Sequence, residues 1–580
     1  MSKIKVLSQN LVNKIAAGEV IERPASVVKE LVENSLDTGA DRIRIIVEEG
    51  GKRLISIQDN GCGMDKEDIK LAFVSHATSK IKSVDDLFAI TTMGFRGEAL
   101  ASIGTVSHVT VTSREKSALT AHELVIADGK LKEPKETGAP EGTTITVEDL
   151  FYNVPARRKF LRSTAAEASY ITETVTKIAM ITPSVDYQMI RDNRRVMTLP
   201  QAASIRERLT SLFGEEFAEG LLEAEESAEK IKVKVLIGSP IQNRADTKMQ
   251  FAFVNNRPIR DKVIIKAIMD AFSGLLPQRR YPVAIVLLEI EPHEIDVNVH
   301  PAKTEIRFKT PGFIHSIVRS TISKALRGSQ QKALTENGIN EDSSLRQERI
   351  KSAIESFLSR AEPKQRDFTK QLRPREEPQK QLSLSDKIPL EPSEKFIQFH
   401  DSYIVMETKT GIIVIDQHAL HERIIYEEVK QRYASKSIES QRLLFPEVIE
   451  LLPKEKAVIS EVASSLTILG FELEEFGGNS VIVRSIPRVL DRSDIPDAIR
   501  EVIDNYLEET TPNIEKYLES VMQTIACKAA VKAGQKLSKE EIEILLSDSN
   551  KIPALHTCPH GRPIFVNLPL IDIERQLKRR

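Results

Sequence analysis

The feature that most constrains this 580-residue chain is an amphipathic run near its beginning, from Val27 to Asp37. Its polar residues recur at the i, i+3, i+4, i+7 spacing of one helix face, and its apolar residues point the other way. The polar stripe consists of Glu30, Glu33, Asn34 and Asp37. Pro24 suits the first helical turn and Gly39 suits a C-terminal cap. Taken alone, the stripe is typical of a solvated surface helix.

The segments after this helix favour a nucleotide pocket instead. Two strand-like runs, Arg42–Glu49 and Leu54–Gln58, lead directly into Asp59-Asn60-Gly61-Cys62-Gly63-Met64. Further glycine-rich turns occur at Gly94–Leu100 and Gly142–Thr144, and such turns let backbone N–H groups approach phosphate closely. The sequence contains neither a Gly-x4-Gly-Lys-Ser/Thr loop nor a three-glycine Rossmann turn. The two commonest nucleotide-binding motifs are therefore excluded.

Composition limits the class of protein. A chain of this length should hold several domains, because single cores rarely exceed roughly 250–300 residues. Hydrophobic residues make up 41% and the formal net charge is −2, so any DNA binding must come from local basic patches. No apolar run reaches the ~18 residues of a membrane span, and the first residues lack a signal peptide's apolar core. Three cysteines fit a reducing cytoplasm better than a disulfide framework. We therefore expect a cytoplasmic protein, associated with the nucleoid if it acts on DNA.

The ordered set of motifs carries more weight than any single one. Glu30/Asn34, Asp59-x-Gly61-x-Gly63, Gly94–Leu100 and Gly142-Thr143-Thr144 together resemble the GHKL (Bergerat) ATP-binding fold. That fold is shared by DNA gyrase B subunits, heat-shock ATPase chaperones, histidine kinases and MutL.

Longer runs narrow the match. They are Ala16-Ala17-Gly18-Glu19-Val20-Ile21-Glu22-Arg23-Pro24, His76-Ala77-Thr78-Ser79-Lys80, Gly94-Phe95-Arg96-Gly97-Glu98-Ala99-Leu100 and Asn153-Val154-Pro155-Ala156-Arg157-Arg158-Lys159-Phe160-Leu161. With them the chain resembles the MutL family of DNA mismatch repair proteins.

Residue chemistry assigns roles within the pocket. Glu30 is the carboxylate positioned to activate water against the γ-phosphate, and Asn34 offers a neutral oxygen to Mg²⁺. The resemblance implies that Asp59 accepts a hydrogen bond from the adenine amino group, with Thr144 holding the base side. It implies further ATP contacts from Gly61, Gly63, Thr78, Ser79, Lys80, Gly94, Phe95, Arg96, Gly97, Glu98, Ala99 and Leu100. Glu33 and Asp37 are expected to be solvated.

A second α/β domain is expected from residue 205 onward. The runs Phe253–Lys262 and Asp296–Glu305 resemble the second domain of the MutL family, which is related to a ribosomal-protein fold. By that resemblance Lys303 contacts the γ-phosphate as a further catalytic residue. Basic residues near Lys159 and Lys262 are the candidates for DNA contacts, and without a base-reading motif the binding should be non-specific and salt-sensitive.

The C-terminal part carries a candidate metal site. A helix beginning near Asp416 would place His418 and Glu422 on one face, because the two are four residues apart. Cys527 and the pair Cys558 and His560 lie downstream. Thiolate and imidazole ligands suit Zn²⁺, whereas carboxylates suit Mn²⁺ or Mg²⁺.

Asp-Gln-His-Ala-x2-Glu-x4-Glu, Ala-Cys-Lys and Cys-Pro-His-Gly-Arg-Pro together resemble the endonuclease signature found in some MutL homologues. The resemblance implies a metal-dependent DNA-nicking centre with Asp416 and Glu422 as catalytic residues. Glu427 lies about 140° round the helix from Glu422, so we do not expect it to share the metal with His418. His421 is expected to be structural.

The segment Gln441–Pro446 resembles the pattern by which bacterial repair proteins bind the sliding clamp. Its candidate contacts are Gln441, Leu443 and Leu444, and the competing interpretation is the buried start of a strand. The family resemblance implies further partners: MutS, DNA, and a second copy held through the C-terminal domain, with the N-terminal domains closing on ATP. No membrane partner is expected.

The expected fold is therefore α+β and multidomain. We predict a GHKL ATPase α/β sandwich at 1–204, a transducer α/β domain at 205–328, a flexible linker at 329–394, and an α/β dimerisation and endonuclease domain at 395–580. Within the last, residues 447–512 are expected to form an inserted regulatory subdomain. Two other functions stay open: an ATP-dependent matchmaker whose Cys/His cluster is a structural zinc site, and a GHKL chaperone or topoisomerase subunit. The C-terminal signature argues against the second.

Overall fold

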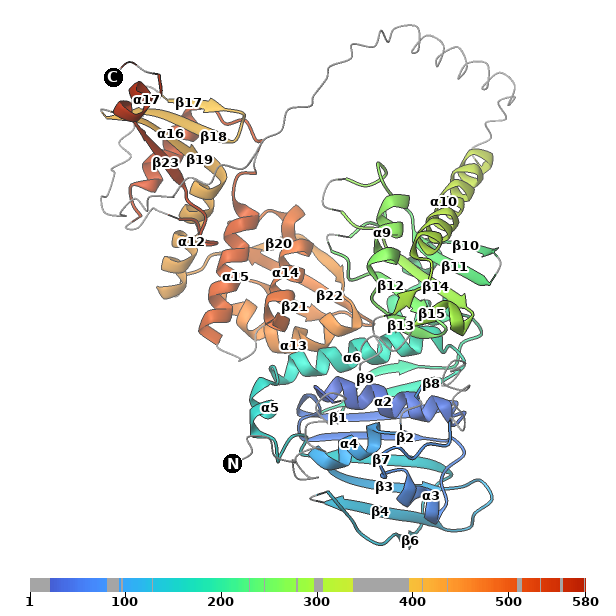
Figure 1. The fold of residues 1–580 in the computed structure, drawn as a ribbon. Coiled ribbons are helices and arrows are strands. Elements are labelled where there is room, and N and C mark those ends of the chain that lie inside the picture. Colours follow the sequence, from blue (N-terminus) through green and yellow to red (C-terminus); the bar gives the residue numbers. More distant parts are fainter. Residues whose placement is uncertain are drawn as a thin grey trace, which may run out of the picture.

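The computed structural model describes residues 21–80, 93–94, 97–296, 306–336, 396–508, 514–552 and 557–579, apart from residues 128, 229, 245, 278–279, 409, 436, 533 and 578. Figure 1 shows the N-terminal domain below, a second α/β domain beside it, and a C-terminal part built from two sheets with their helices. Among the described helices, none is long and apolar enough to cross a membrane.

The N-terminal domain is built on one large, mainly antiparallel sheet. Its strand order is β5-β4-β3-β7-β2-β1-β8-β9, with β6 paired to β4. The strands are β1 (Arg42–Glu48), β2 (Leu54–Asp59), β3 (His108–Arg114), β4 (Ala121–Ala127), β5 (Lys130–Leu131), β6 (Lys135–Thr137), β7 (Gly142–Glu148), β8 (Asp186–Arg191) and β9 (Arg194–Leu199). Only β1 and β8 pair in parallel among these strands. Alternate apolar residues such as Ile43, Ile45 and Val47 are fully buried, as a half-buried strand requires.

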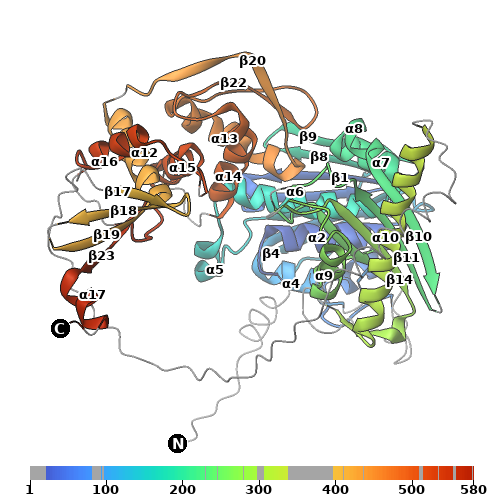
Figure 2. The same cartoon turned by 90° about the horizontal axis from the view of Figure 1, so that it is seen from above.

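The expected first helix and the two strands after it are confirmed. Helix α2 (Pro24–Asp37) begins with its proline in the first turn and buries Val28, Leu31 and Val32. It packs against α6 (Thr164–Ile181), β2 and the short helix η1 (Glu49–Gly51). The other described helices here are α3 (Lys66–Leu71), α4 (Ala99–Val106) and α5 (Pro155–Phe160). The last turns of α2 and the carboxyl end of β2 meet, because Ser35 of α2 donates a 2.7 Å hydrogen bond to Asp59 of β2. Figure 2 shows α2 and α6 from above.

The second domain has a five-stranded sheet in the order β10-β11-β14-β12-β13. Its strands are β10 (Leu221–Ala228), β11 (Ile231–Gly238), β12 (Gln250–Val254), β13 (Arg257–Ile259) and β14 (Ala284–Ile290). Helix α10 (Pro311–Glu336) lies against α9 (Lys262–Ala271) and against β10 and β11. Helices α7 (Ile205–Phe213) and α8 (Glu215–Glu219) precede this sheet. The short pieces η3 (Pro292–Glu294), β15 (Ile295–Asp296) and β16 (Arg307–Phe308) follow it.

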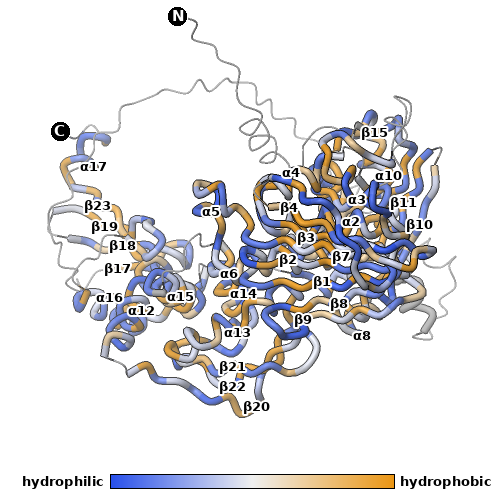
Figure 3. Tube along the Cα trace, turned by 90° about the horizontal axis from the view of Figure 1, so that it is seen from below, coloured by the Kyte–Doolittle hydropathy of each residue, from blue (hydrophilic) through white to orange (hydrophobic). Residues whose placement is uncertain are grey.

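The C-terminal part contains two sheets with separate cores. The first, in the order β17-β18-β19-β23, is made of β17 (Phe396–Phe399), β18 (Tyr403–Thr408), β19 (Gly411–Asp416) and β23 (Phe565–Pro569), with helices α12 (Gln417–Ala434), α16 (Lys539–Ser549) and α17 (Leu570–Gln576). The second, in the order β20-β22-β21, is made of β20 (Ser440–Glu450), β21 (Glu472–Glu475) and β22 (Ser480–Pro487), with α13 (Pro453–Ile468), η4 (Arg492–Asp494), α14 (Ile495–Glu508) and α15 (Ile514–Ala529). Figure 3 shows hydrophobic residues recurring along the strands of these sheets.

The second C-terminal sheet and its helices share one hydrophobic core from Ile425 to Ala530. The segment 447–512 lies inside this unit, but β20 and α15 belong to the same core. We call residues 440–529 the helical subdomain. The predicted linker, 329–394, begins inside α10 and otherwise lies outside the described residues.

Candidate functional site: a nucleotide pocket and a metal-ligand cluster

The last turn of α2 forms one wall of the pocket. Lys80 Nζ donates hydrogen bonds to Asn34 Oδ1 at 2.8 Å and to Asp37 Oδ2 at 2.6 Å. Asp37 also accepts hydrogen bonds from the backbone N–H groups of Met93 and Gly94, at 2.9 and 3.1 Å. The loop that leads into the Gly94 motif is therefore tied to α2 through one carboxylate.

The expectation that Glu33 and Asp37 are solvated was wrong. Glu33 is 4% exposed and the side chain of Asp37 is 8% exposed. Lys29 Nζ lies 3.5 Å from Glu33 and 3.7 Å from Glu30, so it offsets part of the stripe's negative charge. Burial lowers the pKa of Arg257, in the second domain, while Glu33, Asp37 and Glu30 act to raise it. An arginine of the second domain thus lies within electrostatic range of this stripe.

Asp59, at the end of β2, is held as a buried hydrogen-bond acceptor. Its carboxylate accepts from Ser35 Oγ at 2.7 Å, from the backbone of Gly61 at 2.9 Å and from the backbone of Thr143 at 3.3 Å. These donors stabilise a charged carboxylate, which is suited to accept a hydrogen bond from an amino group. Ser35 and its contact with Asp59 were not expected from the sequence.

Thr143, and not the predicted Thr144, lies opposite Asp59. In the antiparallel ladder Asp59 pairs with Thr143, whereas Thr144 pairs with Gln58. Because neighbouring residues of a strand point to opposite faces, Thr143 shares the face of Asp59 and Thr144 does not. Thr143 Oγ1 is also 2.9 Å from Ser113 Oγ. The expected residue was one position out of register.

Two glycines are required by close backbone contacts around the pocket. A Cβ at Gly142, which has φ +103°, would lie 2.1 Å from the carbonyl oxygen of Asp59. A Cβ at Gly97, with φ +63°, would lie 2.3 Å from the carbonyl oxygen of Ala77. Any other residue at these positions would push apart the segments that carry the site.

Most of the remaining predicted ATP contacts lie in the described part of the chain. Thr78, Ser79 and Lys80 follow His76, whose backbone N–H donates to the Gly97 carbonyl at 3.0 Å. Residues Gly61, Gly63, Gly94, Gly97, Glu98, Ala99 and Leu100 are described, with Ala99 and Leu100 opening α4. Phe95, Arg96 and Lys303 lie outside the described residues.

The second site lies where α12 begins in the C-terminal domain. Asp416 caps the helix, and its Oδ1 accepts from the backbone N–H groups of His418 and Ala419 at 3.0 Å each. Glu422 follows on the same helix and is 3% exposed. The side-chain ligand atoms of Glu422, Cys558 and His560 lie within 4.8 Å of one another. The fold therefore brings together three residues that are up to 138 positions apart along the chain.

These three side chains fit a cation. His560 Nδ1 lies 2.6 Å from Glu422 Oε1. The angles of this contact are not those of a hydrogen bond. Glu422 Oε1 is therefore a buried acceptor without a hydrogen-bond donor in the described part of the chain. The turn carrying Cys558 and His560 is closed by a 2.8 Å hydrogen bond from Cys558 N to the Arg562 carbonyl. One carboxylate, one thiol and one imidazole are ligands that Zn²⁺ accepts.

The other predicted ligands surround this cluster. Burial, with Glu422 and Glu501 nearby, raises the pKa of Cys527 to about 11. His418 Nδ1 lies 2.8 Å from the Val531 carbonyl, which leaves Nε2 as the nitrogen with a lone pair if Nδ1 carries the proton. Asp416 and His418 are not members of the three-residue cluster.

Two neighbours of these ligands have structural contacts. His421 Nδ1 accepts a 3.0 Å hydrogen bond from Val531 N. Burial and the adjacent His418 lower the pKa of His421, against a smaller effect of Asp548. Glu427 pairs with Arg423 at 2.7 Å, which agrees with its expected separation from the metal site.

The candidate contacts for macromolecules lie on the surface. Lys159 and Lys262 are exposed, at the last turn of α5 and the first of α9. The pairing of β20 with β22 shifts register between Arg442 and Glu447. Within that interval Leu444 is 88% exposed and Leu443 is partly buried. Gln441, just before the interval, is also exposed. This segment is therefore an exposed edge strand and not a buried one.

Comparison with known proteins follows this division of the chain. Residues 21–148 match the family "Histidine kinase-, DNA gyrase B-, and HSP90-like ATPase", residues 209–327 match "DNA mismatch repair protein, C-terminal domain", and residues 396–537 match "MutL C terminal dimerisation domain". The DNA mismatch repair protein MutL of Syntrophotalea carbinolica is 38% identical over 624 aligned residues, covering 100% of this chain and 99% of that protein. MutL of Caldanaerobacter subterraneus subsp. tengcongensis is 37% identical, with 100% of each chain covered.

Solved structures give a weaker match. The ATPase domain of Aquifex aeolicus MutL complexed with ADP is 26% identical and covers 53% of this chain and 98% of its own, with a TM-score of 0.38. The sequence relatives and the three family matches confirm the resemblance and the expected fold class. At this identity over its whole length, the chain belongs to the MutL family of DNA mismatch repair proteins, and it carries a GHKL ATPase domain and a MutL dimerisation domain.

Proposed function

We propose that this protein uses ATP binding and hydrolysis as a conformational switch in mismatch repair and nicks DNA at a separate metal centre. The observation that carries the second part is the cluster of Glu422 and Cys558, both buried, with His560, which is exposed. It lies on elements of the C-terminal domain that share no residue with the nucleotide pocket. Two sites of different chemistry support two reactions.

In the nucleotide pocket, Glu30 is the proposed base. Its side chain is 18% exposed, so it is accessible to a water molecule that it could orient toward the γ-phosphate. Asn34 would offer its amide oxygen to Mg²⁺, in place of its contact with Lys80. Asp59 would bind the adenine amino group, and Lys303 would contact the γ-phosphate and report the presence of ATP to the second domain.

At the C-terminal site, Glu422, Cys527, Cys558 and His560 would hold Zn²⁺ or Mn²⁺, with His418 and Asp416 at its edge. A metal bound there would supply Lewis-acid chemistry for phosphodiester hydrolysis. The chain's own residues orient the predicted ligands: the Asp416 cap sets the start of α12, and the Val531 carbonyl orients the His418 ring. Asp416 and Glu422 are the proposed catalytic carboxylates.

The proposed partners follow from surface features. Exposed Lys159 and Lys262 would contact DNA phosphates, and Gln441, Leu443 and Leu444 would bind the sliding clamp along the exposed edge of β20. MutS is proposed from family membership. The setting is the cytoplasm, which the three free cysteines in the described residues suit.

A second copy would bind the outer face of the first C-terminal sheet. Ile397, Val405, Val414 and Val566 align across the four strands, and Ile397 and Val566 are 63% and 55% exposed. Leu568 and Leu570 extend this surface and are 42% and 53% exposed. We call these residues the apolar sheet face. A contiguous apolar face of this kind is typical of a protein interface.

The test is plasmid nicking. Wild-type protein with Mn²⁺ should convert supercoiled plasmid to the nicked form, and Asp416→Asn should lose this activity by at least about a hundredfold while it keeps ATP hydrolysis. Glu428→Gln, an ion-paired carboxylate on the same helix, is the matched control and should nick normally. Equal nicking by wild type and Asp416→Asn would favour the alternative, an ATP-dependent matchmaker with a structural zinc site.

A further inference from the structure

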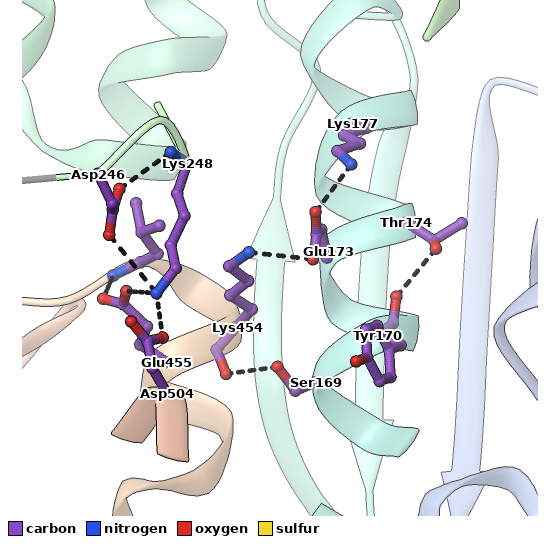
Figure 4. A network of polar contacts seen from close by, with 11 residues as sticks. Ser169, Tyr170, Glu173, Thr174, Lys177, Asp246, Lys248, Lys454, Glu455 and Asp504 are labelled. Atoms are coloured by element: carbon purple, nitrogen blue, oxygen red, sulfur yellow. Dashed lines mark hydrogen bonds and ion pairs between the residues drawn. The ribbon is translucent and has the colours of Figure 1, made fainter. Parts of the chain in front are cut away.

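The helical subdomain lies against the N-terminal domain along one pair of helices. Helix α13 of the helical subdomain packs on α6, the helix that also supports α2 (Figures 1 and 2). Ser169 Oγ donates a 2.9 Å hydrogen bond to the Lys454 carbonyl, and Lys454 Nζ lies 3.1 Å from Glu173 Oε2 (Figure 4). Ala165 of α6 is fully buried within the core of the helical subdomain. Small residues on α6 allow the two helices to approach closely.

A second contact joins the helical subdomain to the second domain. Lys248, just before β12, pairs with Asp504 of α14 and lies 3.7 Å from Glu455 of α13. Glu455 is 2% exposed and accepts a 2.9 Å hydrogen bond from Leu452 N. One cation of the second domain therefore compensates two carboxylates of the helical subdomain.

Further hydrogen bonds surround these two contacts. Arg162 Nη1 donates to the Leu507 carbonyl and Asn479 Nδ2 donates to the Leu212 carbonyl, each at 2.6 Å. Arg191 donates to the carbonyl of Ala457. A cavity of about 40 Å³ is left between Arg244 of the second domain and Arg500 of the helical subdomain. These hydrogen bonds join the helical subdomain to the segment before α6, to β8 and to α7.

We propose that α6 and Lys248 form a docking surface for the helical subdomain of the same chain. The two surfaces are complementary in charge. Burying Glu455 without a cation would cost far more than the ion pair gains, and Lys248 supplies that cation from across the interface. Glu173, which pairs with Lys177 on its own helix, gains a second lysine there, Lys454. The segment 337–395 can reach at most about 200 Å, which holds the partner surface at high effective concentration. The docking does not depend on the proposed ATP or nuclease chemistry.

The docking surface lies close to the predicted nucleotide site. Helix α6 packs on one side against α13 and on the other against α2, which carries Glu30 and Asn34. The helical subdomain is thus one helix away from the nucleotide pocket. Any change in the docked population alters the packing of the helix behind the ATP site.

The test is hydrogen exchange by mass spectrometry on the full chain. Glu173→Lys and Lys454→Glu should each speed amide exchange in α13 by about tenfold or more, since each places like charges in contact at an interface. The double variant Glu173→Lys/Lys454→Glu should return α13 exchange to within about threefold of wild type, because it restores an opposite-charge pair. Glu223→Lys is the matched control: it breaks the 2.7 Å pair with Lys234 inside the second domain and should leave α13 unchanged.

Mixing the two single variants decides whether docking occurs within one chain. If the helical subdomain docks on its own chain, a mixture of Glu173→Lys and Lys454→Glu proteins stays fast-exchanging. Restored protection in the mixture would show docking on a second copy and would overturn the proposal. Unchanged α13 exchange in both single variants, or no rescue in the double variant, would overturn it as well.

Discussion

Asp37 is the residue whose contacts differ most from what its position in the sequence predicts. Its spacing on α2 is that of a solvated acidic stripe, yet it binds Lys80 and two backbone N–H groups of residues 93–94. Periodicity correctly placed Glu30 and Asn34 on one face, because helical spacing is local information. Burial of Asp37 depends on segments more than 40 positions away, which no helix periodicity contains.

We predict that Asp37→Asn weakens ATP binding. The variant loses the charge that pairs with Lys80 and one acceptor for the loop at Met93 and Gly94. Hydrogen bonds to charged groups contribute roughly 1.5–3 kcal/mol, so the Kd for ATP, measured by titration calorimetry, should rise at least about tenfold. Asp149→Asn, an exposed carboxylate after β7, is the control. Identical ATP affinity in both variants would contradict the role of Asp37.

Glu173 gives a pH-dependent prediction. Burial would raise its pKa, but Lys177 and Lys454 overcome that effect and lower the pKa to about 2. The charged carboxylate therefore stabilises the folded protein above about pH 4.5, its usual pKa, and this contribution is lost as the pH falls toward 2. Glu173→Gln should melt at a lower temperature than wild type at pH 7, with a difference that shrinks between pH 4.5 and 2.5. A constant difference across that range would contradict the ion-pair account.

At the scale of elements, the sequence predicted the helices and strands that follow from local periodicity. It did not predict features that depend on which strands pair with each other. Helix α2 and strands β1 and β2 were predicted within a few residues of their ends, because glycines and proline mark their limits. Thr144 was predicted at the site of Thr143 because strand register is fixed only by the partner strand. The predicted metal ligands on α12 were proposed from helical spacing, whereas the approach of Cys558 and His560 to Glu422 could be expected only from the motif resemblance and not from any local pattern.

The apolar sheet face gives a prediction at this scale. Val566 on β23 is 55% exposed, so Val566→Asp should leave the fold intact but place a charge in the proposed dimer interface. Hot-spot residues of an interface contribute about 2 kcal/mol or more, so the dimer dissociation constant should rise at least about thirtyfold. Light scattering after gel filtration measures the change. Ile468→Asp, with 54% exposure on α13, is the control; a dimer that persists in Val566→Asp would exclude this face.

At the scale of the whole molecule, the nucleotide pocket and the metal-ligand cluster belong to different domains. The pocket is built on α2, β2 and β7, and the cluster on α12 and the turn before β23. The helical subdomain lies between them and packs on α6. Under the proposed function, Glu30 would control timing and Glu422 would belong to the cutting site. The order of the ATPase, second and dimerisation domains was predictable from motifs, but the contact across α6 was not, because its residues carry no motif.

The most direct test measures both reactions in two variants of the full chain. Glu30→Ala should bind ATP but hydrolyse it about 10²–10⁴-fold more slowly, and it should still nick supercoiled plasmid with Mn²⁺. Glu422→Gln should show the reverse: wild-type ATP hydrolysis and no nicking. If Glu30→Ala hydrolyses ATP at the wild-type rate, or if Glu422→Gln nicks plasmid as well as the wild type does, the assignment of two separate sites is wrong.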